Sequence, residues 1–195
     1  MAYITCKGLT YAPYTSGGDS SAIVYGTGKA KTDYLCRVEM TENRNTVKEH
    51  ADGHQIDSEN SMDDMTINFE LANVDSDIKT DILGMDSSGT GASAELVAYG
   101  DDAPFVGIGF IIANRFKGTT TYNAYWIYKA QFASAGVTAE TRREQTSFQH
   151  ETINGSVSGV KLSGDTQFRF RAEKIGCTSE SDARTWLNGK AGITG

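Results

Sequence analysis

Apolar and polar residues alternate with period two along much of the chain. Residues 64–71, "DMTINFEL", place their apolar side chains on one face and their polar side chains on the other. The segments 34–40 and 167–173 repeat the pattern. The apolar positions of the three segments are Met65, Ile67, Phe69 and Leu71; Tyr34, Cys36, Val38 and Met40; and Phe168, Phe170 and Ala172. Such alternation predicts antiparallel sheets with one solvated face.

Helical periodicity is confined to two short segments. In residues 75–84, Asp75 or Ser76 is suited to cap the helix and Gly84 to end it. The apolar face of this helix would consist of Ile78, Ile82 and Leu83. A second helix is predicted from about Ser181 to Gly189. Because both are short, packing rather than intrinsic propensity must hold them.

The most apolar region reads as a hairpin, with strands Phe105–Ala113 and Tyr122–Phe132 joined by a turn around Gly118. One register places Phe110 opposite Trp126. It would gather a core layer of Val106, Ile108, Phe110, Ile112, Trp126, Tyr128 and Phe132. The reverse face would carry Gly107 and Gly109 beside Tyr125, Ile127 and Lys129, which indicates close approach of another element or subunit there. A slip of one residue would exchange the two faces.

The segment 41–64 is polar, has few apolar anchors and lies between two predicted strands. Ordered loops of this length are uncommon in compact domains and usually contact a partner. We therefore expect a long functional loop here.

Composition narrows the class of protein. The chain has 195 residues, of which 38% are hydrophobic, and no linker divides it, so we expect a single domain over residues 1–195. We expect no membrane segment and no secretion signal, hence folding in a cytoplasm. The formal net charge of -7 disfavours sequence-independent binding of nucleic acid.

The sequence offers little catalytic chemistry. His50 and His54 flank Asp52, but Gly53 and the polar setting favour solvated loop histidines over a metal site. Cys6, Cys36 and Cys177 show no ligand spacing, which favours buried free thiols. We therefore expect neither an enzyme nor a bound cofactor or metal.

An ordered series of segments resembles the major tail tube proteins of long-tailed, non-contractile bacteriophages. The segments are "GLTYAPYT", "IVYGTGKA", "VEMTENRNTVKEHADGHQID", "MTINFELANV", "DIKTDILG", "DDAPFVGIGF" and "YNAYWIYKAQFASAGVTAETRREQTSFQHETINGSV". Together they cover residues 8–160. Each is weak alone, and the resemblance depends on their order and spacing.

The resemblance implies a mainly β fold, an antiparallel β-sandwich or barrel with one short flanking helix and long loops. It implies a structural virion protein that forms hexameric rings, which stack into a tail tube and pass DNA through the lumen without specific binding. Its other partners would be the tape-measure protein and the tail terminator or distal tail proteins, and the tube would assemble in the host cytoplasm. By position, the loop 41–64 would reach a neighbouring subunit through Asn43, Arg44, Asn45, Val47, His50, Asp52, His54 and Ile56. Residues 164–195 would supply a strand and either a terminal arm or a further part of the sandwich.

Two alternatives stay open. A carbohydrate-binding β-sandwich module would stack sugars on an exposed Trp126 or Trp186. A capsid decoration or tail-completion protein would form a single ring or a trimer that does not propagate.

Overall fold

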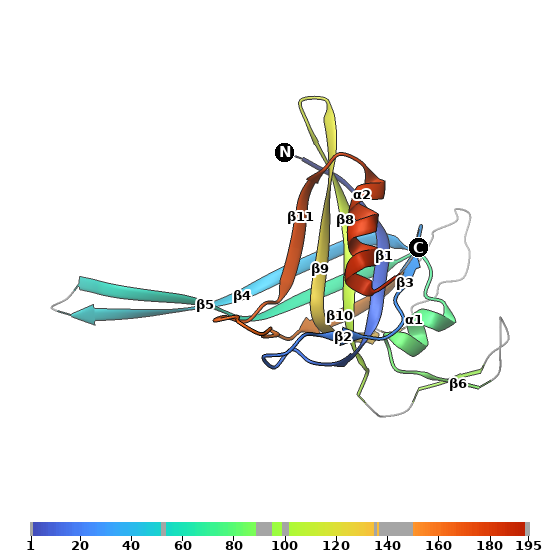
Figure 1. Cartoon of the computed structure of the whole chain (residues 1–195), viewed down its shortest axis with the longest axis horizontal. Helices are drawn as coiled ribbons and strands as arrows, with labels where there is room; N and C mark the ends of the chain where they lie inside the picture. Colours follow the sequence, from blue (N-terminus) through green and yellow to red (C-terminus); the bar gives the residue numbers. More distant parts are fainter. Residues whose placement is uncertain are drawn as a thin grey trace, which may run out of the picture.

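The chain folds mainly into antiparallel β-structure, which confirms the predicted class. The computed structural model describes residues 2–51, 54–88, 95–98, 102–134, 136 and 150–193 (Figure 1). Its main sheet has the strand order β2-β1-β8-β9-β10-β5-β4, with β3 beside β1 and β11 beside β9. The strands of this sheet are β1 (Ala2–Ser16), β2 (Val24–Tyr25), β3 (Lys29–Lys31), β4 (Leu35–Ala51), β5 (His54–Leu71), β8 (Phe105–Phe116), β9 (Thr119–Ser134), β10 (Glu151–Val157) and β11 (Arg171–Cys177). A separate ribbon pairs β6 (Asp86–Ser88) with β7 (Glu95–Val97).

The sheet curls around an inner core. This core contains residues from β1, β5, β8, β9 and β10. It also contains Ile78 of helix α1 (Ser76–Asp81) and Ile82, the residue that follows this helix. The alternation predicted for 64–71 is confirmed, because Met65, Ile67, Phe69 and Leu71 are fully buried. The edges β1 and β4 approach each other, and the Cys6 thiol donates a hydrogen bond to the Cys36 carbonyl over 3.3 Å. No β-ladder joins these two edges in the described residues.

An outer core lies on the opposite face of β8 and β9, beneath helix α2 (Glu180–Ala191). Ala183, Leu187 and Ala191 of α2 are fully buried against Trp126 and its neighbours. The second helix that the sequence predicted is therefore present and is twelve residues long, whereas the family resemblance implied one flanking helix. This helix passes through its predicted end at Gly189 and stops at Gly192, whose φ of 69° is the left-handed conformation typical of a helix C-terminus.

The predicted register of the β8–β9 hairpin is wrong by one residue. Phe110 lies opposite Tyr125, and Gly109 lies opposite Trp126. Both faces of the hairpin are buried, so alternation alone could not choose between them. A bulge between the pairs at Ile127 and Ala130 then reverses the facing of β9. As a result the predicted single layer is divided: Ile108, Phe110 and Phe132 lie in the inner core, and Trp126 and Tyr128 lie in the outer core.

Gly107 and Gly109 lie where other side chains come close to the sheet. A Cβ on Gly107 would be 2.6 Å from atoms of Trp126 and Tyr25. A Cβ on Gly109 would be 2.7 Å from Leu187 Cδ2 and 2.8 Å from the Tyr125 carbonyl oxygen. The approaching elements are thus α2 and β2 of the same chain.

The segment after residue 163 forms part of the body. Its strand β11 pairs with β9, but it begins at Arg171 and not at Gln167. Phe168, predicted to face inward, is 63% exposed. Cys177 at the end of β11 is buried, whereas Cys36 is exposed, and all three thiols are free.

Helix α1 begins as the sequence predicted. The Asp75 carboxylate accepts a hydrogen bond from the Ile78 backbone N–H over 3.0 Å. Two lysines of β3 hold the helix against the sheet. The ion pairs are Lys29–Asp77 (3.1 Å), Lys29–Asp81 (2.8 Å), Lys31–Asp75 (2.6 Å) and Lys31–Asp77 (2.7 Å).

These ion pairs shift the pKa values of the two carboxylates at the helix start. Burial raises the pKa of Asp75, but hydrogen bonds from Lys31, the Ile78 N–H and Tyr34 outweigh it and leave the pKa lowered. Hydrogen bonds from Lys31 and Lys29 lower the pKa of Asp77. A carboxylate with a lowered pKa in the folded state stabilises the fold above its unfolded pKa. That contribution is lost as pH falls through the lower, folded-state pKa.

Replacing Lys31 with methionine is expected to lower the free energy of unfolding by about 2 kcal/mol at pH 7, because two carboxylates lose a charged donor. Urea unfolding at pH 7 and at pH 3 measures the effect. The difference from the wild type should shrink at pH 3, below the unfolded pKa near 3.8. Lys79→Met, which removes a lysine of helix α1 itself, is the control. An equal Lys31→Met effect at both pH values would contradict this role of the ion pairs.

Candidate functional site

A long hairpin projects from the sheet. Strands β4 and β5 pair from Leu35 opposite Leu71 to Ala51 opposite His54, with three shifts of register along the way. The neighbouring strand β10 pairs with β5 only as far as Met65. Beyond that point the two strands extend away from the body, and we call residues 43–51 and 54–64 the arm (Figure 1).

The predicted loop at 41–64 is therefore wrong in its local structure, because all of its described residues are in β-strands. Sequence alternation failed to show this since neither face of the arm is buried in the chain's own core. Cross-strand contacts replace core packing. Near the base of the arm, the Asn43 amide donates a hydrogen bond to the Asp64 carboxylate over 2.5 Å.

The base of the arm is fixed to β11 by charge. The Arg171 guanidinium contacts the Glu42 carboxylate at 2.8 Å and also pairs with Glu173. Its carbon lies 6.0 Å from the centroid of the Tyr125 ring. These contacts position the arm where it leaves the sheet.

The described residues of the arm have no packed apolar face. A two-stranded ribbon without a packed face is marginally stable in water. Val47 is 60% exposed, and the side chains of Asn43 and Arg44 donate hydrogen bonds to Asp64 and Glu42 within the same hairpin. Residues 41–64 include seven carboxylates and two basic side chains, a formal charge of -5. The segment 41–64 thus accounts for most of the molecule's net charge of -7, and the arm itself carries a formal charge of -3.

The predicted contact residues are distributed along the arm. Asn43, Arg44, Asn45 and Val47 lie on β4, and His54 begins β5. His50 and Ile56 also lie within the strands, and their side chains are outside the description. Asp52 lies outside the described residues.

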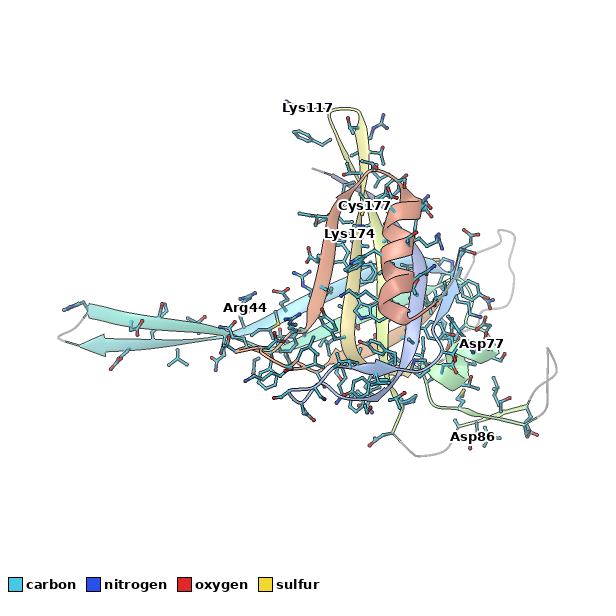
Figure 2. The ribbon with its side chains drawn as sticks, in the orientation of Figure 1. Arg44, Asp77, Asp86, Lys117, Lys174 and Cys177 are labelled. Atoms are coloured by element: carbon cyan, nitrogen blue, oxygen red, sulfur yellow. The ribbon has the colours of Figure 1, made fainter. Side chains whose placement is uncertain are left out.

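The turn around Gly118 between β8 and β9 is present as predicted, but sequence reasoning missed the exposed aromatic side chain beside it. Phe116 there is 52% exposed and is flanked by Arg115 and Lys117 (Figure 2). The signal was present in the sequence. Phe116 stands between two basic residues and directly before the two-residue turn of the hairpin. A side chain in that position lies far from the core.

The described residues contain little that could support catalysis. No group of three histidine, cysteine or acidic side chains in the described ranges could hold a metal ion. A hollow of about 740 Å³ over β5, β9 and β10 is lined by uncharged polar and apolar groups, and Asp102 is the one carboxylate among the described residues that line it. One carboxylate does not supply an acid–base pair.

Comparisons with known proteins leave the chain without an assigned relative. No protein-family model matches it, and no curated protein matches it significantly. Within the described ranges, none of the helices has the length and apolar character needed to cross a membrane.

Proposed function

We propose that this chain is a structural, self-assembling virion protein that forms the tail tube of a long-tailed, non-contractile bacteriophage. Hexameric rings of the chain would stack into a tube that passes DNA into the host. The observation that carries the proposal is the arm, a projecting hairpin with no core of its own. No described residue outside the hairpin covers its faces, and in a homo-oligomer a partner that covers them is another copy.

The sheet edges support assembly as well. The outer edges of β4 and β11 form no β-ladder with another strand in the described part of the chain. Exposed edges favour pairing with other chains unless they are covered, and closure into a ring covers them. A contact between a projecting arm and a different surface of the next copy is heterologous, and such contacts generate rings or helical filaments.

The charge of the molecule fits passage of DNA without binding. At physiological salt the screening length is about 8 Å, so carboxylates repel only phosphates that come close. A narrow acidic lumen would meet that condition. The tape-measure protein and the tail terminator or distal tail proteins would be its further partners.

The carbohydrate-binding alternative loses its principal platform. Trp126 is fully buried in the outer core, where its indole N–H lies 3.3 Å from the Tyr25 hydroxyl. A buried indole cannot stack on a sugar. Trp186 is partly buried and lies near the ammonium group of Lys190, 5.4 Å from its ring centroid.

Negative-stain electron microscopy of the purified, concentrated chain tests the proposal. The expected result is hollow tubes of uniform width, or stacked rings, because each copy offers an arm to the next. Single rings that never lengthen would favour a decoration or completion protein. Monodisperse monomer at every concentration would rule out self-assembly.

A further inference from the structure

The far end of the β8–β9 hairpin is an apolar and cationic surface. Lys117 and Gly118 form its two-residue turn with φ values of 48° and 85°. The Lys117 ammonium lies 5.4 Å from the centroid of the Phe116 ring, at the tip labelled in Figure 2. Neither Arg115 nor Lys117 forms an ion pair with any described residue. We call Arg115, Phe116 and Lys117 the tip.

The surface next to the tip is also incomplete in the single chain. Tyr3 of β1 lies opposite Asn114 of β8 and is 74% exposed. Asn114 is fully buried, and neither atom of its amide group has a hydrogen-bond partner in the described chain. Exposed aromatic rings beside an unsatisfied buried amide are features that contact with another molecule commonly relieves.

The arm carries a surface of opposite character. Val47 and Glu49 are two residues apart on β4 and therefore share a face. Glu49 lies directly opposite Asp57 of β5, and both side chains are exposed. Like charges directly opposite each other destabilise a strand pair. Neither carboxylate has a basic partner among the described residues, so a cation supplied from outside would stabilise the arm. We call Val47, Glu49 and Asp57 the arm patch.

The two surfaces match in chemistry. Each has one large exposed apolar side chain beside two charges, and the charges are opposite in sign. They lie on different projections of the molecule, so the arm patch and the tip of one chain can each engage a different neighbour (Figure 1). We propose that the arm patch of one copy docks on the tip of a second copy, with the Glu49–Asp57 pair facing Arg115 and Lys117. This contact rests on the self-assembly proposed above and assigns it a pair of surfaces.

Two charge-reversal variants test the contact. The tip variant carries Arg115→Glu and Lys117→Glu, and the arm variant carries Glu49→Lys and Asp57→Lys. Each alone places like charges across the contact, so its critical concentration for assembly should rise at least tenfold. Mixed in equal amounts, the two variants should co-assemble. The acidic arm of the tip variant meets the basic tip of the arm variant, and the basic arm of the arm variant meets the acidic tip of the tip variant. Sedimentation velocity and electron microscopy measure both results.

The control variant carries Lys79→Glu and Lys161→Glu, which changes the net charge as much as the tip variant does at sites away from both surfaces. It should assemble like the wild type, and circular dichroism should show that every variant is folded. If both reversal variants assembled at the same concentration as the wild type, or if they failed to co-assemble on mixing, the contact would be overturned. The proposed function would stay intact. A wild-type chain that stays monomeric would overturn both.

Discussion

Alanine in place of Gly109 is expected to lower the free energy of unfolding by about 3 kcal/mol, the upper part of the usual range for an over-packed core. The added Cβ would be 2.7 Å from Leu187 Cδ2, 2.8 Å from Trp126 Cε3 and 2.8 Å from the Tyr125 carbonyl oxygen. The carbonyl belongs to the paired strand β9 and cannot move without disturbing the ladder. Chemical denaturation followed by tryptophan fluorescence measures the change.

The matched control is Gly189→Ala. Gly189 lies within α2, and a Cβ there would meet nothing within 4 Å. Alanine should therefore stabilise the protein by about 0.5–1 kcal/mol through its helix propensity. If the two alanine variants shifted stability in the same direction, close packing at Gly109 would not be the cause.

Removal of the arm is expected to abolish assembly and to leave the body folded. In the variant, a two-residue Asn-Gly turn replaces residues 44–63. It connects Asn43 to Asp64, and these two residues lie opposite each other in the wild type. Both core clusters are retained, because neither includes a residue of the deleted segment. The thermal midpoint should therefore stay close to that of the wild type, while electron microscopy should show no rings or tubes.

Circular dichroism of the shortened chain, and mixing it with the wild type, distinguish loss of the arm from a general loss of structure. The shortened chain keeps its tip, so it should bind wild-type arms and shorten wild-type tubes in proportion to its share of the mixture. Tubes of normal length formed by the shortened chain alone would show that the arm is dispensable for assembly.

The sequence predicted the elements whose environments are asymmetric. In 64–71 one face packs in the core and the other meets solvent, so alternation shows which residues are buried. Helix α1 has a cap and a terminating glycine adjacent to it in sequence. Both signals are local. The cap at Asp75 is confirmed, whereas the helix ends at Asp81, three residues before Gly84, whose φ is 71°.

Prediction failed where the pattern is symmetric. Both faces of β8–β9 are apolar, so a shift of one residue leaves the pattern unchanged, and nothing local marks the bulge between Ile127 and Ala130. The arm is polar on both faces and for that reason resembled a loop. The ion pairs of Lys29 and Lys31 with α1 join residues more than 40 positions apart, which spacing along the chain cannot show.

The absence of a β-ladder between the edges of β1 and β4 in the described residues has a mechanical consequence. Because β4 has no ladder on its outer side in the described chain, the arm is tethered through β5, which is bonded to β10 over seven residue pairs. A pull along the arm loads these bonds in shear, so they share the force instead of opening one by one. β10 passes the load directly to β9 at the centre of the sheet. Tension between neighbouring copies would therefore run through paired strands, and the body could resist stretching without help from its loops.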